Sequence, residues 1–197
     1  MIALVRHGQS TSNAQGLVVG RGDPPLTELG ERQARALAPW LENVTHVWTS
    51  PLRRARETAA IAMPGLVAVT KESFVELDYG SFEGSSTTLA ADEGWRALEQ
   101  RHDQAFGGGE SLADVDVRVQ NELDALLGDA TSLLHSPDEH LAIVSHVSPI
   151  KSAVAWALGV PGTVAWRMRL ENGSLTLVAA RSGTPRLIRY NAVPLLT

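Results

Sequence analysis

The chain places an arginine and a histidine side by side, directly after its first predicted strand. Residues 2–5 (Ile-Ala-Leu-Val) form a short apolar run, and Arg6, His7 and Gly8 follow it. In open α/β sheets, ligands bind at the carboxyl edge of the strands. Arginine can hold two phosphate oxygens in a planar fork, and glycine lets a backbone approach closely. The segment therefore predicts part of an anion site, with His7 as a candidate nucleophile.

Four segments of the chain could meet at this edge of the sheet. The first extends to Ser10 and Asn13, which add hydrogen-bonding groups to the predicted anion site. The other three are residues 50–58, residues 76–84 and the pair 145–146. Because three of the four segments follow predicted strands, we expect their polar side chains to converge at the carboxyl edge.

The elements that must position these groups alternate between strands and helices. Short apolar segments predict strands at residues 2–5, 46–49, 67–69 and 141–145. Helical spacing of apolar residues predicts helices over 28–41, 53–62, 112–126 and 149–158. In the tail, Asn172-Gly173 favours a hairpin that pairs 164–170 with 174–180, and 186–190 is a further predicted strand. This order predicts a three-layer α/β/α sandwich with a mostly parallel central sheet and an antiparallel extension.

Composition limits the class of protein. The 197 residues are 44% hydrophobic and 20% charged, as in ordinary soluble proteins, and predict a single domain over 1–197. Residues at about 80–110 are rich in glycine, serine and acidic side chains and are predicted to form a short cap over the site. A net charge of −5 argues against a general nucleic-acid binder, and the absence of cysteine excludes disulfides and thiolate chemistry.

The N-terminal apolar run is too short for a targeting or membrane segment. Only four apolar residues precede Arg6 and His7, so we expect neither a signal peptide nor a membrane span. The expected location is cytoplasmic, with no membrane partner.

Two motifs resemble a known family. Residues 6–13 (Arg-His-Gly-Gln-Ser-Thr-Ser-Asn) resemble the signature of the histidine phosphatases, also called the phosphoglycerate mutase-like superfamily. Residues 50–59 (Ser-Pro-Leu-Arg-Arg-Ala-Arg-Glu-Thr-Ala) resemble that family's Ser-Pro-x-x-Arg-Ala-x-x-Thr-Ala segment, and on this match Arg54 is a second phosphate-binding arginine. The small size, the Ser-Pro-Leu motif and the short cap look like the alpha-ribazole phosphatase and broad-specificity phosphatase branch.

The third motif supplies a carboxylate. In the family stretch that residues 76–84 resemble, a glutamate is followed by glycines four and eight positions later, and Gly80 and Gly84 fall in that register. The resemblance therefore implies that Glu76 is the general acid, which protonates the leaving alcohol and then deprotonates an attacking water. Asp78 is the rival carboxylate.

The fourth motif places His146 after the most apolar strand and before a helix N-terminus, where backbone N–H groups favour an anion. A protonated His146 would add positive charge to the site. The family commonly has glycine after this histidine, whereas this chain has Val147. Val147 can offer its N–H but cannot easily take a positive φ, and Ser148 is an alternative donor.

The resemblance implies a metal-independent phosphomonoester hydrolase that acts through a phosphohistidine on His7. Arg6, Arg54 and His146 would neutralise the phosphoryl oxygens, with Ser10, Asn13 and Val147 as further phosphate-binding groups. No cofactor is implied. A metal ion held by His7, His146 and Asp78 or Glu76 would have to share the site with basic side chains.

Two other functions stay open. A cofactor-dependent phosphoglycerate mutase would need a longer, more basic cap, whereas residues 85–110 offer Arg96, Arg101 and His102. The apolar cap residues suit a substrate with an apolar portion, or pin the cap to the core; they are Leu89, Trp95, Leu98 and Phe106. A non-catalytic phosphate-binding regulatory protein is the other alternative. The expected partner is a small phosphorylated metabolite, and the oligomeric state is open, a homodimer included.

Overall fold

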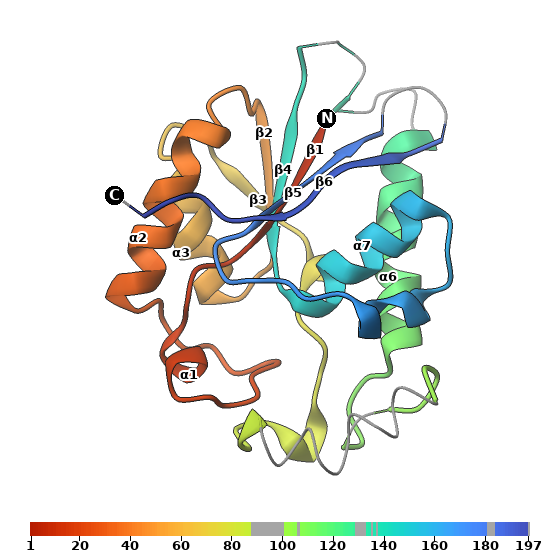
Figure 1. Ribbon diagram of the computed structural model, residues 1–197. Coiled ribbons are helices and arrows are strands. Elements are labelled where there is room, and N and C mark those ends of the chain that lie inside the picture. Colours follow the sequence, from red (N-terminus) through yellow and green to blue (C-terminus); the bar gives the residue numbers. More distant parts are fainter. Residues whose placement is uncertain are drawn as a thin grey trace.

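A mixed sheet forms the centre of the molecule in the computed structural model (Figure 1). The structure describes residues 1–87, 101–105, 107–128, 133–134, 136, 138–180 and 184–196. Over these residues the sheet has six strands in the order β3-β2-β4-β1-β5-β6. Their bounds are β1 Ile2–Arg6, β2 His46–Thr49, β3 Ala68–Thr70, β4 Leu141–Ser145, β5 Leu175–Ala179 and β6 Arg186–Ala192.

The strands divide into a parallel part and an antiparallel part. β3, β2, β4 and β1 run parallel to their neighbours, and Arg6 at the end of β1 lies opposite Ser145 at the end of β4. β5 pairs antiparallel with β1, and β6 pairs antiparallel with β5. The predicted mostly parallel sheet with an antiparallel extension is thereby confirmed.

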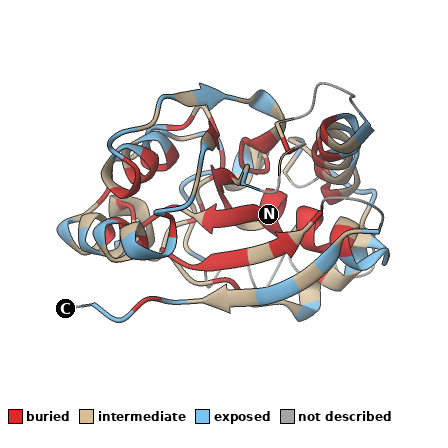
Figure 2. Ribbon diagram, turned by 90° about the horizontal axis from the view of Figure 1, so that it is seen from above, coloured by how far each residue is buried: buried red, intermediate tan, exposed pale blue. Residues whose placement is uncertain are grey.

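Helices cover both faces of the sheet because successive strand residues point to opposite sides. On one face Ile2 and Leu4 of β1 pack in a core with α6 and α7, and on the other Ala3 and Val5 pack in a core with α2 and α3. The helices are α2 Glu28–Leu37, α3 Arg53–Ala62, α6 Leu112–Gly128 and α7 Val147–Leu158. Figure 1 shows one pair of helices on each side of the sheet, and Figure 2 shows the buried residues in the central strands and on the inner helix faces. The three-layer prediction is correct.

Side-chain caps and a left-handed glycine fix several of the helix ends. Thr27 caps α2 through its hydroxyl, as an N-cap threonine does. α3 lacks a cap of its own, and Asp23 accepts the N–H of Arg53 instead. Ser111 and Asp114 exchange hydrogen bonds at the start of α6. A left-handed Gly159 ends α7, where glycine takes positive φ without strain.

The predicted hairpin around Asn172-Gly173 is wrong. Residues Gly162–Arg167 form a 3-10 helix, η5, that packs against α7, and the antiparallel pair is β5 with β6. A strand over 164–170 would need a free sheet edge beside β5. That edge does not exist, because β1 and β6 occupy both sides of β5.

Short helices link these elements. They are α1 Thr11–Ala14, η1 Ala38–Trp40, η2 Glu72–Phe74 and η3 Gly80–Phe82. Of the predicted cap at about 80–110, residues 88–100 and 106 lie outside the described residues, and so do Leu89, Trp95, Leu98 and Phe106. No helix in the described part of the chain has the length and apolar character needed to cross a membrane.

Candidate active site

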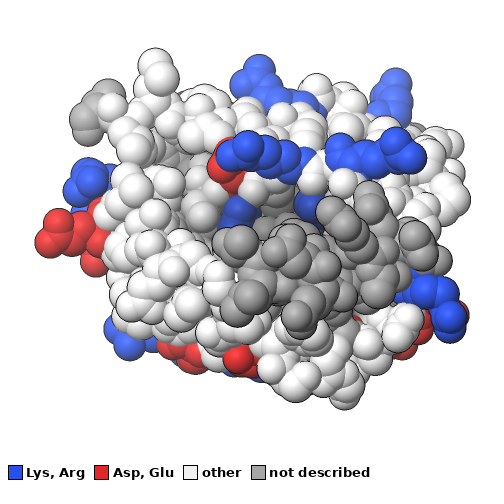
Figure 3. Space-filling view, turned by 60° about the horizontal axis from the view of Figure 1, so that its bottom comes forward, with Lys and Arg blue, Asp and Glu red and all other residues white. Residues whose placement is uncertain are grey.

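The four predicted segments meet at the carboxyl edge of the parallel strands. His7 follows β1, and its N–H donates to the carbonyl of Ser145 at the end of β4, 3.0 Å away. Arg54 on α3 and His146 before α7 both contact this centre. Figure 3 views this side of the molecule, where basic side chains border a hollow beside the residues drawn in grey.

Nε2 is the unprotonated ring nitrogen of His7. Its Nδ1 lies 2.6 Å from the carbonyl oxygen of Gly8, so this nitrogen carries the proton. Nε2 lies 3.2 Å from Nε of Arg54, which donates to it, so the lone pair is on Nε2. Burial and the charges of Arg54 and Arg6 hold the pKa of His7 well below its ordinary value. The imidazole is therefore neutral at pH 7.

The backbone of His7 is held by a turn that the sequence patterns did not assign to the site. Asn172 Nδ2 and Gly173 N–H both donate to the carbonyl oxygen of His7, at 3.2 and 3.0 Å. Asn172 also donates to Oδ1 of Asn13. The signal in the sequence was Asn172-Gly173 itself, a turn whose residues serve this site instead of a hairpin.

Ser10 and Asn13 already have partners in the protein. Ser10 is fully buried and caps α1, and its hydroxyl and N–H both bond Asn13 Oδ1. Their hydrogen bonds close a capping box around the start of α1. The geometry gives both residues a role in shaping the loop after His7, and their predicted phosphate contacts stay a prediction.

Arg54 is buried and fixed through all three nitrogens of its guanidinium. Besides the bond to His7, Nη1 donates to Gly22 O at 2.7 Å and Nη2 donates to Gly20 O at 2.9 Å. The loop that supplies these carbonyls is itself held by Glu83, whose carboxylate accepts three consecutive N–H groups, those of residues 20–22. Glu83 lies within the 76–84 segment, and the sequence patterns gave it no role of its own.

Arg6 is the second arginine whose charge acts on His7. One of its terminal nitrogens donates to Leu170 O, while its Nε is buried without a hydrogen-bond partner in the described part of the chain. Burial lowers the pKa of Arg6, but a guanidinium in a protein keeps its charge. Arg6 therefore contributes a second fixed positive charge.

Glu76 lies in the site and Asp78 turns away from it. Glu76 is buried, and its carboxylate accepts the N–H groups of Leu77, Val147 and Ser148 at 2.8, 3.0 and 3.1 Å. Asp78 is partly exposed and accepts the N–H of Gly80. Of the two candidate carboxylates, only Glu76 contacts the segment after His146.

The N–H groups of Val147 and Ser148 differ from the prediction. Val147 was expected to offer its N–H to the anion, with Ser148 as an alternative donor. Both N–H groups donate to Glu76 instead, because a carboxylate at a helix N-terminus satisfies its first free N–H groups. Val147 begins α7 with a helical backbone and does not take positive φ. Glycine is therefore not required at this position.

His146 is neutral in this arrangement, which corrects the expectation of a protonated ring. Its ring is fully buried with its centroid 5.0 Å from that of His7. Burial, then Arg54, His7 and Arg6, hold the pKa of His146 well below its ordinary value. Nε2 lies 2.7 Å from Ser50 Oγ, while Nδ1 is buried and unpartnered within the described residues. If Ser50 donates to Nε2, Nδ1 carries the proton and is a free donor.

Gly8 is needed for packing against a helix. A Cβ on Gly8 would lie 2.2 Å from the carbonyl oxygen of Gly30 in α2, and a Cβ on Gly30 would lie 2.1 Å from Gln9 O. The lack of a side chain at Gly8 therefore lets the backbone of α2 pack closely against it. This contact holds α2 against the loop that carries His7.

The two neutral histidines should make the stability of the fold depend on pH. In the unfolded chain both titrate near pH 6.5, whereas in the fold their pKa values lie well below it. At a pH between the folded and the unfolded pKa values, the unfolded chain binds protons that the folded chain does not. Stability is therefore fully present above about pH 6.5 and falls as the pH decreases below it. We expect the free energy of unfolding in urea to fall by up to about 1.4 kcal/mol per pH unit and histidine. His7→Gln should reduce this slope, and an unchanged slope would contradict the assignment.

Taken together, the site offers a neutral imidazole, two guanidinium groups and a buried carboxylate. An electron-rich Nε2 can attack a phosphorus atom whose oxygens are neutralised by arginine. The arrangement is suited to transfer of a phosphoryl group.

Known proteins with similar sequences extend over most of the chain. The bifunctional protein Rv2228c of Mycobacterium tuberculosis is 34% identical over 184 residues, which cover 89% of this chain and 49% of that protein. The chain thus spans about half the length of that relative. A probable phosphoglycerate mutase GpmB of Cronobacter sakazakii is 34% identical over 185 residues, or 90% of this chain and 83% of the relative.

Solved structures and a family model agree with these relatives. A mycobacterial glucosyl-3-phosphoglycerate phosphatase, solved with VO3, superimposes with a TM-score of 0.86 at 29% identity and covers 97% of this chain and 98% of its own. The model of the histidine phosphatase superfamily (branch 1) matches residues 2–193. The chain therefore belongs to the histidine phosphatase superfamily, branch 1.

Proposed function

We propose that this protein hydrolyses a phosphate monoester through a phosphohistidine on His7, without a metal ion. In the first step Nε2 of His7 attacks phosphorus, and the bond from phosphorus to the alcohol oxygen breaks. The alcohol leaves with a proton from Glu76. In the second step a water attacks the phosphohistidine, Glu76 takes a proton from it, and the N–P bond breaks to release phosphate.

The observation that carries this proposal is the state of His7. Its tautomer is set by Gly8 O, its lone pair is on Nε2, and its depressed pKa keeps it unprotonated at neutral pH. A neutral nucleophile suits a phosphate monoester, because the charged ester repels an anionic one. Arg54 beside Nε2 also marks where the phosphoryl oxygens would lie.

Two buried nitrogen atoms without a hydrogen-bond partner support an anion in this site. Arg6 Nε and His146 Nδ1 are buried without a hydrogen-bond partner in the described residues. A buried polar group left unpaired costs about 1–3 kcal/mol. Phosphoryl oxygens would supply partners for both groups and would be neutralised by Arg6 and Arg54.

Glu76→Gln should reduce turnover far more than Asp78→Asn. General acid–base catalysis contributes about 10²–10⁴-fold, and glutamine keeps the size of the side chain but cannot exchange a proton. The comparison is made as kcat on an alkyl phosphate, whose alcohol leaves poorly, with each variant's fold checked by circular dichroism. If Asp78→Asn showed the larger loss, the acid role would move to Asp78.

The function as a whole is tested on a panel of phosphate esters. The panel includes aryl phosphates, and 3-phosphoglycerate with and without a bisphosphate primer, with released phosphate and isomerised product both measured. The similarity to GpmB keeps a mutase as the second candidate, and primer-dependent isomerisation without phosphate release would favour it. Binding of vanadate without turnover of any ester would favour a phosphate-binding regulatory protein.

A further inference from the structure

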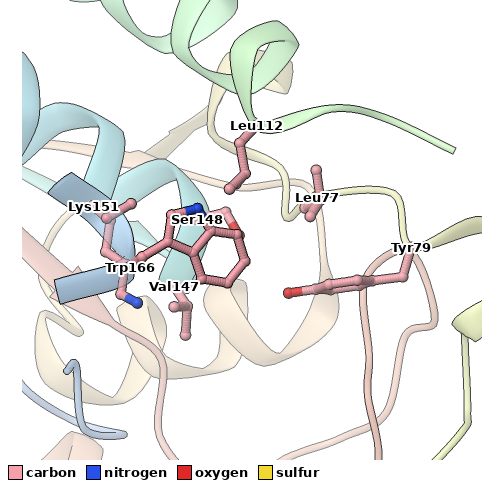
Figure 4. A pocket seen from close by; sticks show the side chains of 8 residues that line it. Leu77, Tyr79, Leu112, Val147, Ser148, Lys151 and Trp166 are labelled. Atoms are coloured by element: carbon pink, nitrogen blue, oxygen red, sulfur yellow. The ribbon is translucent and has the colours of Figure 1, made fainter. Parts of the chain in front are cut away.

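A pocket opens beside Glu76, and its wall is mostly apolar. It encloses about 440 Å³ of empty space, open solvent at its mouth included. Leu77, Leu112, Tyr79 and Trp166 supply most of the wall. In Figure 4 the hydroxyl end of Tyr79 points across the pocket toward Trp166, and Leu77 and Leu112 point in from the same side.

The pocket begins at the proposed general acid. The three N–H groups that donate to the carboxylate of Glu76 belong to Leu77, Val147 and Ser148, and all three residues line the pocket. Tyr79 is also tied to this wall by a hydrogen bond with the Ser148 side chain. A group that receives a proton from Glu76 is therefore next to this pocket.

Lys151 is a cationic residue that lines this mostly apolar pocket. Lys151 lies on α7, four and three positions after Val147 and Ser148, so the three residues share one face of the helix. It is half-buried, and no hydrogen bond or ion pair joins its ammonium group to another described residue. Burial lowers the pKa of Lys151 and the charge of Glu76 acts in the opposite direction.

An ammonium group with its solvation reduced and no counter-ion among the described residues is suited to bind a ligand anion. The phosphoryl group itself is accounted for by Arg6 and Arg54. Lys151 can pair with one further negative charge on the ligand. The leucine and aromatic side chains around it favour an apolar group in the rest of the ligand. A sugar or polyol with several phosphates would find too few cations and too few polar partners here.

We propose that this pocket binds the alcohol part of the substrate, and that the substrate is a phosphate monoester whose alcohol has an apolar or aromatic body and one carboxylate, which pairs with Lys151. This inference rests on the proposed function, since it places the leaving group next to Glu76. It adds the chemical class of that leaving group and the residue that recognises its charge.

The test compares two aryl esters that differ by the carboxylate, phenyl phosphate and 4-carboxyphenyl phosphate. For the wild type we expect the higher kcat/KM on 4-carboxyphenyl phosphate. Lys151→Met should lower that value by about 10- to 100-fold, the usual loss for a hydrogen bond to a charged group, and leave phenyl phosphate within about 3-fold. Lys151→Arg should keep most of the preference. Lys71→Met is the matched control, because Lys71 pairs with Glu122 outside the pocket.

A binding measurement separates this inference from the proposed function. The free alcohols 4-hydroxybenzoate and phenol are titrated calorimetrically into wild type and Lys151→Met, which needs no turnover. Tighter binding of 4-hydroxybenzoate to the wild type alone supports the pocket even if no ester is hydrolysed. Trp166→Ala should weaken both alcohols and leave inhibition by inorganic phosphate unchanged.

Three outcomes overturn the inference. If Lys151→Met lowers kcat/KM equally on both esters, Lys151 acts on the phosphoryl group. If the wild type shows no preference for the carboxylate in turnover or in binding, Lys151 is not a recognition residue. If Trp166→Ala leaves the binding of both alcohols unchanged, the alcohol part does not lie in this pocket.

Discussion

Replacing His7 by alanine is expected to lower kcat on aryl phosphates by on the order of 10⁴-fold or more, because the nucleophile is lost while the fold remains. The loss should be in kcat, since the proposed phosphoryl-binding groups Arg6 and Arg54 are unchanged in the variant. Short incubation with labelled substrate should trap a phosphoenzyme in the wild type that survives alkali and decays in acid, as an N–P bond does. The variant should form none.

The control for this experiment is His46→Ala, the same change at a partly exposed histidine at the start of β2. It should leave kcat within about 2-fold, as surface substitutions usually do. Added imidazole should restore part of the activity of His7→Ala by entering the space of the lost ring. Substantial activity of His7→Ala without imidazole would remove His7 as the nucleophile.

Replacing Arg54 by methionine should lower kcat by about 10²–10³-fold, the range for losing one preorganised donor to developing charge. Methionine fills much of the space but leaves Nε2 of His7 and the carbonyls of Gly20 and Gly22 without their donor. Arg54 is also one cause of the low pKa of His7. Its removal should therefore raise the pKa of His7 and move the acid limb of the kcat/KM profile to higher pH.

Arg56→Met is the matched control on the same helix, because Arg56 is exposed. It should change neither kcat nor the pH profile. Arg54→Lys keeps the charge but not the fork and should fall between the other two variants. If Arg54→Met lost activity with an unmoved acid limb, Arg54 would act only through the position of its loop.

The central sheet could be predicted because its signals are local. The run Leu141–Ser145 is fully buried and reads as a strand by itself, and Thr27 and Gly159 mark helix ends by side-chain chemistry and by backbone freedom. The tail could not be predicted in the same way. The alternation over 164–170 is compatible with a strand, but strand formation depends on a free sheet edge.

The site shows the same contrast between features with a local sequence signal and features that depend on distant contacts. His7, Arg54 and His146 could be brought together because each follows a strand or lies at the start of a helix at one edge of the sheet, and Glu76 was added through the motif that residues 76–84 resemble. The partners of these groups depend on contacts between distant segments. Val147 and Ser148 donate to Glu76, which lies more than 70 positions earlier in the chain, and no local pattern in the sequence reports that pairing.

One peptide unit in the loop beside Arg54 joins two opposite charges that do not touch. In the peptide between Gly20 and Arg21, the N–H donates to the Glu83 carboxylate and the carbonyl accepts from Arg54. Hydrogen bonds in such a chain polarise one another, so the anion strengthens the bond that the carbonyl makes. Glu83 therefore acts as a remote counter-ion for Arg54. It steadies the guanidinium without competing with a phosphoryl oxygen, as a carboxylate in direct contact would.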